Sequence, residues 1–479
     1  MALSQEKRNE ILVYLKEQIA QSDYRLKAYV FNEAEKRNPT RNIYVKLNGF
    51  IKKYLNQTKE ARWFVLNGLR GAGKTTLLAQ LYCDKYDKDV HKLYLSIDHL
   101  VRIIGVSLDD VLSVYEEFLG VSFERLNKPV LLFLDEIHAD SKWAITIKSV
   151  YDRTKNVCIF ATGSSALLLN TNADIERRAV FIKLYPLSFT EYMKIKHGQY
   201  ETKGLANDIR EALFESANSV EVYNRLTKLK QKINQYWMKI DRHEIDSYIK
   251  YGSLPFMIAL NNEPIIYEQI SRTLDKIIMD DVAYFGRFNS ENLSKIPAIL
   301  YMLAEADQVV LSKMADTIRI TRHTLMEILS VLERTETINR IYPYGGHYTQ
   351  VRKPSKFLFS APAFRAMYYH FIGNIKPLSY CIGKLYEDTV GMYLVRLFNG
   401  RINYSITYDS AEEGADYILN LQDRKIVIEV GSGEKDLRQV RNTALKVKSL
   451  YNFVISKESL SLSEENNTVK IPFEYFLLI

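Results

Sequence analysis

Val65-Leu66-Asn67-Gly68-Leu69-Arg70-Gly71-Ala72-Gly73-Lys74-Thr75-Thr76-Leu77-Leu78 is the stretch that decides the fold of this 479-residue chain. The apolar run from Trp63 to Leu66 predicts a buried strand, and residues 76–81 have helical character. Between them lies the pattern Gly68-x-x-x-x-Gly73-Lys74-Thr75. The order of strand, glycine loop and helix is the context that makes this pattern a phosphate-binding loop.

Each residue type in the loop suits phosphate binding. Glycines let backbone N–H groups converge on an anion, and the helix N-terminus adds partial positive charge. We expect Lys74 to reach the β- and γ-phosphates and the Thr75 hydroxyl to ligate Mg²⁺. The sequence therefore predicts a site for ATP with Mg²⁺, and its nucleotide-binding residues are Gly68, Arg70, Gly71, Ala72, Gly73, Lys74, Thr75 and Thr76.

A second informative segment runs from Val130 to Glu136 and ends in two adjacent carboxylates. Its five apolar residues predict a strand buried on both faces, as parallel sheets require. Open α/β sheets bind ligands at the carboxyl ends of their strands. We expect Asp135 to accept a hydrogen bond from Mg²⁺-bound water. We expect Glu136 to orient or deprotonate the attacking water.

A third predicted strand, residues 156–165, has a polar end. Thr162 and Ser164 are candidates for sensing the γ-phosphate through a hydrogen bond. The alternative is a plain turn, since serine and glycine are common in turns. Upstream of the loop, Arg41 is a candidate for contact with a nucleotide base or for capping a helix.

Composition sets broad limits. Hydrophobic residues make up 47% of the chain and charged residues 25%, as in soluble globular proteins. No apolar run is long enough for a membrane span, and the charged N-terminus lacks an apolar signal core, so we expect a cytoplasmic protein. Cys83, Cys158 and Cys381 form no metal or redox spacing. The net charge of +8 permits contact with nucleic acid.

Together the motifs resemble the archaeal-type AAA ATPases. The likeness rests on the phosphate loop, on Leu-Asp-Glu-Ile-His at 134–138, on Thr-Gly-Ser-Ser at 162–165 and on Pro-Leu-Ser-Phe-Thr-Glu at 186–191. It covers roughly residues 41–479 and is sharpest between 64 and 191. Relatives of this type usually carry Gly-Arg shortly before the Pro-Leu-Ser-Phe segment. Here the pair is Arg177-Arg178, so Arg178 matches the arginine and is a candidate arginine finger or γ-phosphate sensor, with a surface salt bridge as the alternative.

The resemblance implies an α/β fold: a P-loop parallel-sheet core with a helical lid, a winged helix and a C-terminal α/β nuclease-like domain. The expected domains are 1–40, an N-terminal helical segment; 41–190, the ATPase core; 191–290, the lid; 291–360, the winged helix; and 361–479, the nuclease-like domain. In the winged helix we expect strands at 337–343 and 350–357 around Gly345-Gly346. Residues that would face a DNA backbone there are Arg319, Arg322, His323 and Lys353, although winged helices also bind proteins.

The C-terminal part resembles PD-(D/E)xK nucleases. Glu387 matches the helix acid, and Asp416 and Glu429 match the two strand carboxylates, which together imply a second metal site. The position that would carry the lysine is Gly431, so a nuclease-like scaffold without cleavage is expected. Lys435 or Lys425 could substitute if the fold brings either amine to the metal.

The sequence and the resemblance predict an ATP-hydrolysing ATPase that is associated with double-stranded DNA. Its catalytic residues would be Lys74, Glu136, Thr162 and Arg178. If Arg178 acts on a neighbouring copy, activity requires a homo-oligomer. Two alternatives remain: a nucleotide-dependent assembly switch that does not touch DNA, and an ATP-gated, metal-dependent nuclease, which Gly431 disfavours.

Overall fold

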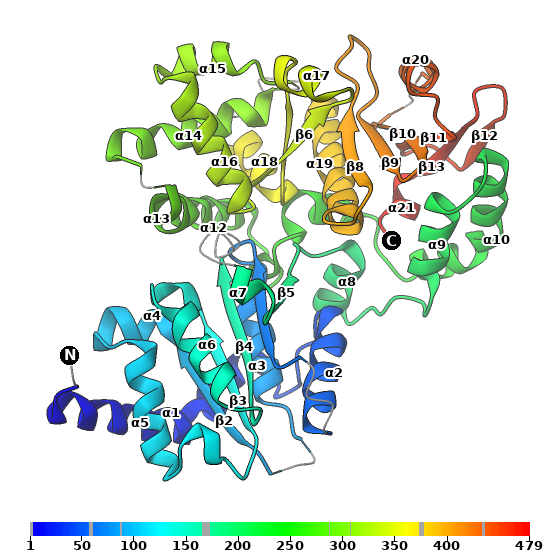
Figure 1. Ribbon diagram of the computed structural model, residues 1–479. Coiled ribbons are helices and arrows are strands. Elements are labelled where there is room, and N and C mark those ends of the chain that lie inside the picture. The colour runs from blue at the N-terminus through cyan, green and yellow to red at the C-terminus, as the bar shows by residue number, and fades with distance from the viewer. Residues whose placement is uncertain are drawn as a thin grey trace. The chain divides into compact units, whose positions relative to one another are not determined.

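A computed structural model describes residues 3–56, 61–86, 89–164, 173–286, 288–306, 308–372, 378–433 and 436–479 (Figure 1). Lys435, one of the predicted substitute lysines, lies outside these residues. The chain divides into two compact units, Met1–Tyr185 and Pro186–Ile479. Each unit is described below by itself.

The first unit alternates strands and helices. Its main elements are α1 (Gln5–Val30), α2 (Ile43–Leu55), β1 (Trp63–Gly68), α3 (Lys74–Tyr82), β2 (His91–Ser96), α4 (Ile97–His99), α5 (Leu108–Leu119), β3 (Val130–Asp135), α6 (Trp143–Arg153), β4 (Val157–Ser164), α7 (Ala173–Glu176) and β5 (Val180–Lys183). The helix ends follow local sequence: α5 starts at a capping box of Ser107 and Asp110 and stops at Gly120, which has a left-handed backbone.

Among the described residues, five parallel strands form the sheet of this unit in the order β2-β3-β4-β1-β5. Alternate residues of a strand face opposite sides. Trp63 and Val65 therefore join a core with α5 and α6, whereas Phe64 stacks on Phe50 of α2 and on Phe160, with ring centroids 4.7 Å apart in both pairs. Figure 1 shows α6 in front of the sheet and α3 behind it. The predicted α/β class and parallel-sheet core are confirmed.

The second unit begins with helices. They are α8 (Phe189–His197), α9 (Leu205–Phe214), α10 (Ser219–Trp237), α11 (His243–Ser247), α12 (Glu263–Lys276), α13 (Ala283–Gly286), α14 (Ser290–Glu305), α15 (Leu311–Ile318) and α16 (Arg322–Arg334). There follow β6 (Ile338–Pro343), α17 (His347–Arg352), β7 (Lys356–Phe359), α18 (Pro362–Ile372), α19 (Leu378–Phe398), β8 (Tyr404–Tyr408), β9 (Tyr417–Leu421), β10 (Arg424–Val430), α20 (Arg438–Val447), β11 (Tyr451–Ser456), β12 (Ser461–Ser463), β13 (Thr468–Pro472) and α21 (Phe473–Phe476).

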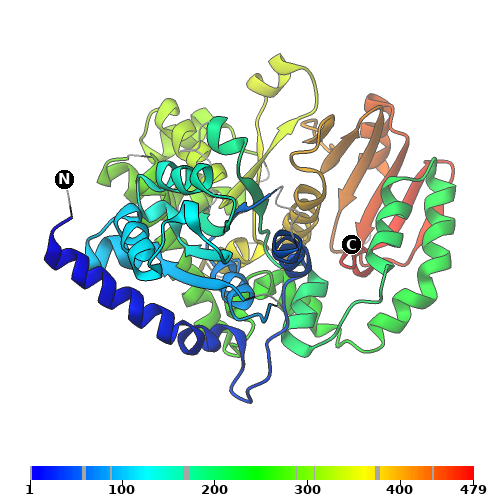
Figure 2. The ribbon, with the colours of Figure 1, turned by 60° about the horizontal axis from the view of Figure 1, so that its bottom comes forward.

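Within the described part of the second unit, eight strands form one mixed sheet in the order β12-β13-β11-β10-β9-β8-β6-β7. Helix α20 packs on one face, through Val440 and Val447 against Val427. Helices α9 and α10 lie beside the C-terminal strands, as Figure 2 shows, and Phe214 of α9 contacts Phe453 edge-on. The C-terminal part is therefore a second α/β layer structure.

The hairpin of β6 and β7 differs from the sequence prediction in one respect. The predicted second strand, 350–357, is wrong, because residues 347–352 form α17 and β7 spans only Lys356–Phe359. Pro354 lacks an N–H and cannot donate to a strand ladder, which accounts for the late start of β7. Strand β6 also pairs in parallel with β8, so the hairpin belongs to the same sheet as the C-terminal strands.

Among the helices that the structure describes, none is both long and apolar enough to cross a membrane.

Candidate functional site

The glycine loop joins the end of β1 to the start of α3. Gly71 and Gly73 have φ values of 82° and 92°, in the left-handed region that glycine adopts without a steric penalty. Gly73 is also the residue that precedes the first turn of α3. The loop backbone thus needs glycine at these two positions, and it leads straight into a helix N-terminus.

Lys74 is the first residue of α3, and only 6% of it is exposed. Its Nζ donates to the carbonyl oxygens of Gly68, at 2.9 Å, and Leu69, at 3.2 Å. These two carbonyls hold the ammonium group against the loop. The positive charge is therefore fixed at the place where the sequence analysis expects phosphates.

Thr75, Asp135 and Thr162 come together at the carboxyl ends of neighbouring strands. The Thr75 Oγ1 lies 2.9 Å from Asp135 Oδ2, and the Thr162 Oγ1 donates to Asp135 Oδ1 at 2.5 Å. Strand β4 lies between β1 and β3 in the sheet, so Thr162 is placed between the loop and the acidic strand. Three residues predicted from separate motifs therefore form one hydrogen-bonded group.

Tyr94 of β2 is a fourth member of this group that the sequence analysis missed. Its hydroxyl donates to Asp135 Oδ2 at 3.1 Å. Burial raises the pKa of Asp135, and the charge of Glu136 adds to this effect, whereas the hydroxyls of Thr162, Thr75 and Tyr94 oppose it. The three hydroxyl groups thus favour the ionised carboxylate that a cation site requires.

Glu136 follows Asp135 in a left-handed conformation, with φ of 52°. Its N–H donates to Thr162 Oγ1 at 3.0 Å, and its side chain is 38% exposed, so the carboxylate can meet solvent. The Nδ1 of His138 lies 3.4 Å from Glu136 Oε2. Burial lowers the pKa of His138; Glu136 acts in the opposite direction, and Lys74 and Arg70 lower the pKa further. His138 was also missed as a neighbour of the site.

Arg178, the predicted arginine finger, follows α7 in the first unit. Arg178 forms a two-pronged ion pair with Asp152 of α6, with distances of 3.0 and 3.2 Å. Its role as an arginine finger stays a prediction.

Arg41 is buried and donates to the carbonyl oxygens of Ala72, at 2.8 Å, and Tyr185, at 2.9 Å. Arg41 therefore connects the glycine loop to the segment that follows β5.

Gly68 makes a prediction for stability. A Cβ at this position would lie 2.3 Å from the carbonyl oxygen of Leu184, which is backbone and cannot rotate away. We expect Gly68→Ala to lower the free energy of unfolding by about 1–3 kcal/mol, the usual cost of overpacking, and to weaken ATP binding. Chemical unfolding and ATP titration measure the two effects.

Gly49 is a matched control in the same unit, because a Cβ there meets nothing within 4 Å. It lies inside α2, so Gly49→Ala should raise the free energy of unfolding by roughly 0.5–1 kcal/mol. Equal effects of the two substitutions would contradict the steric account of Gly68.

The C-terminal carboxylates lie in the second unit. Glu387 on α19 is 5% exposed, and Glu429 on β10 is 2% exposed. Asp416 directly precedes β9, and its Oδ2 accepts from the Val430 N–H at 2.9 Å, so Asp416 lies next to the end of β10 that carries Glu429. Burial acts to raise the pKa of Glu387, but the neighbouring charges of Lys356 and Lys384 outweigh it and hold that pKa far below its usual range.

The lysine that pairs with these carboxylates is Lys356, which the sequence did not predict for this role. Lys356 of β7 forms ion pairs with both Glu387 and Asp416. Lys425, a predicted substitute, is wrong for this role, because its Nζ donates to the carbonyl oxygen of Val447. Lys425 lies near the start of β10, whereas Glu429 lies at the other end of the same strand. Within the described residues, no group of three or more His, Cys, Asp or Glu side chains is arranged to hold a metal ion.

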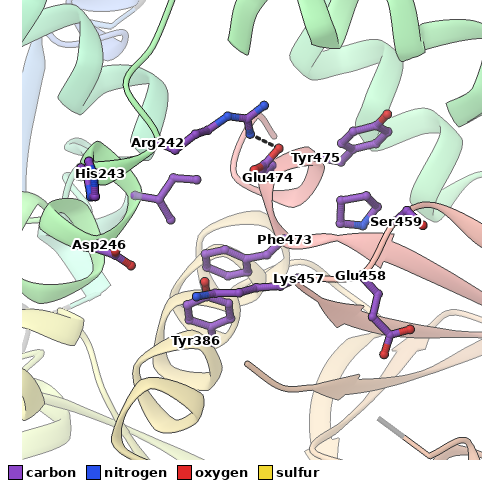
Figure 3. Close-up of a pocket in the computed structure, with 12 residues that line it drawn as sticks. Arg242, His243, Asp246, Tyr386, Lys457, Glu458, Ser459, Phe473, Glu474 and Tyr475 are labelled. Atoms are coloured by element: carbon purple, nitrogen blue, oxygen red, sulfur yellow. Dashed lines mark ion pairs between the residues drawn. The ribbon is translucent and has the colours of Figure 1, made fainter. Parts of the chain in front are cut away.

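A pocket of about 510 Å³ lies beside α19, lined by Arg242, by residues of α11, α19, β13 and α21 and by residues 457–459 (Figure 3). Tyr386 stacks on Phe473 with ring centroids 3.9 Å apart, and Arg242 pairs with Glu474. Glu458 pairs with Lys470 at 2.6 Å. Arg242, Glu458 and Glu474 of the pocket wall thus form ion pairs within the protein, and we assign the pocket no ligand.

Comparisons with known proteins give two matching family models and several relatives of this chain. A family model described as an AAA domain matches residues 60–193, and one described as a domain of unknown function, DUF8612, matches residues 242–368. The uncharacterized protein MJ1637 of Methanocaldococcus jannaschii is 35% identical over 434 residues, which are 90% of this chain and 87% of the relative. The chain belongs to the MJ1637 family.

Another relative of this chain, an uncharacterized protein of Haemophilus influenzae, is 25% identical over 281 residues, which are 56% of this chain and 59% of the relative. The ORC1 protein of Aeropyrum pernix, solved in complex with DNA, matches 69% of this chain and 92% of its own with 12% identity. Its TM-score of 0.32 is too low to carry a conclusion. The matched model and the parallel sheet together make residues 60–193 a P-loop domain of the AAA type.

Proposed function

We propose that the protein binds ATP with Mg²⁺ and hydrolyses the γ-phosphate. The observation that carries the proposal is the hydrogen-bonded group of Thr75, Asp135 and Thr162, which faces a loop that holds Lys74. Glu136 lies directly beside this group with a half-exposed carboxylate. These are the residue types that phosphoryl transfer uses for phosphate binding, cation binding and water activation.

The donor atoms fit a magnesium ion. Mg²⁺ prefers oxygen ligands and is usually bound by one or two protein groups together with substrate phosphates and water. The Thr75 hydroxyl and the Asp135 carboxylate, whose oxygens lie 2.9 Å apart, would hold it. The bound ion would supply neutralisation of charge on the phosphate oxygens.

The residues of the chain divide the remaining work. The backbone N–H groups of the loop and Lys74 bind the phosphates, and Glu136 orients the attacking water and accepts its proton. Arg178 serves as the arginine finger, either in its own site or in that of a neighbouring copy. For this role it exchanges the Asp152 carboxylate for a phosphate, which is also an anionic oxygen group.

We also propose that the second unit contacts double-stranded DNA. The order of elements in residues 290–359 supports a winged-helix domain, because three helices, α14, α15 and α16, are followed by the β6–β7 hairpin. Four exposed basic residues lie here: Arg319 directly after α15, Arg322 and His323 at the start of α16, and Lys353 directly after α17. The order α19-β8-β9-β10-α20-β11 likewise supports a nuclease-like scaffold. Positive side chains at these positions suit phosphate contacts, which supply most non-specific affinity for DNA.

Salt dependence tests the DNA proposal. Each phosphate contact contributes about −0.9 to the slope of log affinity against log salt. We expect Arg322→Ala/Lys353→Ala to reduce the size of that slope by about 2, measured by fluorescence anisotropy with labelled duplex DNA.

Lys228→Ala/Lys230→Ala is the matched control, because it removes the same charge from exposed positions on α10. The proposal would be contradicted by an unchanged slope in Arg322→Ala/Lys353→Ala, or by an equal decrease of the slope in both double variants. Either result would show that the winged-helix surface does not contact DNA. Wild-type ATP turnover that rises with protein concentration and ignores DNA would instead favour a self-assembling switch.

A further inference from the structure

Lys356 is a buried cation in the second unit, and it takes no part in the proposed ATP site. It is the first residue of β7, and it is 6% exposed. Its Nζ contacts Glu387 Oε1 and lies 2.9 Å from Asp416 Oδ1. One ammonium group thus bridges two carboxylates that come from a helix and from the start of a strand.

Every oxygen of these two carboxylates lies against an ammonium group or a backbone N–H of the protein. Glu387 Oε2 accepts from Lys384 Nζ at 2.8 Å, and Asp416 Oδ2 accepts from the backbone N–H of Val430 at 2.9 Å. The remaining two oxygens contact Lys356. A divalent ion needs such oxygens as direct ligands, so it would have to displace both lysines.

The surroundings hold Lys356 in place. The rings of Tyr417 and Tyr408 lie 5.3 and 5.9 Å from its Nζ, within the range of cation–π attraction. The hydroxyl of Tyr417 donates to the Glu387 carbonyl oxygen at 2.8 Å, which ties β9 to α19. Gly391 lets α19 approach closely, since a Cβ there would lie 2.3 Å from Leu358 Cδ1 of β7. The ammonium group is packed from several sides.

We propose that Lys356 is a built-in cation that occupies the position of a divalent metal between Glu387 and Asp416. The nuclease-like scaffold then uses the cluster as a metal-independent clamp, which joins β7 to α19 and β9. Glu387 and Asp416, paired as they are with Lys356 and Lys384, do not fit the metal site that the resemblance to nucleases implies. This inference concerns the second unit and stands whether or not the first unit hydrolyses ATP.

The test measures Mn²⁺ binding to the full-length protein without nucleotide, by the electron paramagnetic resonance signal of free Mn²⁺. All variants carry Asp135→Asn, so that the loop carboxylate contributes no ion. In this background we expect the same number of bound ions with and without Asp416→Asn. Lys356→Met should gain one Mn²⁺ per chain, and Lys356→Met/Asp416→Asn should lose it again.

Loss of one bound ion on Asp416→Asn alone would overturn the proposal, because Asp416 would then be a metal ligand with Lys356 present. A folded Lys356→Met variant that gains no ion would also overturn it, and circular dichroism establishes the folding. Should Lys356→Met fail to fold, the comparison of Asp416→Asn with its parent still decides between the clamp and a metal site.

Discussion

Replacing Glu136 with glutamine should lower ATP turnover by about 10²–10⁴-fold, the usual contribution of a general base. Glutamine has nearly the same size as glutamate, and the backbone N–H that donates to Thr162 is unchanged by the substitution. The end of β3 should therefore keep its geometry. Nucleotide affinity should stay within about threefold of wild type, because Lys74, Thr75 and the loop carry the binding. Phosphate release and equilibrium ATP binding measure the two quantities.

Glu35 provides the control for this substitution. It is exposed in the same unit and has φ of 55°, close to the 52° of Glu136, so Glu35→Gln changes the same residue type in the same backbone conformation. We expect wild-type turnover from Glu35→Gln. Unchanged turnover in Glu136→Gln would remove Glu136 from the mechanism.

Replacing Arg365 with methionine should lower the free energy of unfolding of the second unit by about 3–5 kcal/mol, as expected when one partner of a buried ion pair is lost. Arg365 and Asp388 are both almost fully buried, and they pair at 2.6 Å. The guanidinium also donates to the carbonyl oxygens of Ala304, at 2.5 Å, and Phe357, at 3.3 Å. The substitution thus leaves a buried carboxylate and buried carbonyls without their donor.

Arg272 is the matched control for Arg365, since it forms an exposed helical ion pair with Glu268. Arg272→Met should change the free energy of unfolding by less than about 0.5 kcal/mol. Urea unfolding followed by tryptophan fluorescence compares the two variants. Similar midpoints for Arg365→Met and Arg272→Met would show that the buried pair contributes little to stability.

The grouping of Thr75 with Asp135 was predictable because both lie at the same edge of a parallel sheet. Lys74 and Thr75 follow a glycine loop that itself follows a strand, and Asp135 ends another apolar strand. In a parallel sheet such strand ends meet at one edge, so the contact between Thr75 and Asp135 follows from sequence order. The same reasoning applies to Thr162, because β4 also ends at this edge.

Tyr94 and His138 were not predictable in the same way. The contact of Tyr94 with Asp135 depends on the register of β2 against β3, which pairs Ser96 with Asp135. The approach of His138 to Glu136 depends on the left-handed backbone at Glu136. In strands that are buried on both faces the continuous apolar run does not reveal the register. A left-handed backbone at a glutamate likewise has no sequence pattern.

The lysine of the C-terminal cluster was missed for a different reason. The nuclease motif normally carries its lysine two residues after the strand glutamate, and in this chain that position is Gly431. Lys356 lies 60 residues before its partner Asp416, and it reaches the carboxylates only because the β6–β7 hairpin joins the C-terminal sheet. Contacts between distant segments of this kind depend on topology, which composition and spacing do not reveal.

The most direct test of the central claim is phosphate release from ATP by the purified wild-type protein and by Lys74→Ala, with Mg²⁺ present. We expect steady turnover by the wild type. In Lys74→Ala it should fall by about 10²–10³-fold, the loss typical when one charge-stabilising group is removed from a reaction site. Absence of turnover in the wild type at every protein concentration, or equal turnover in the two proteins, would contradict hydrolysis at this loop.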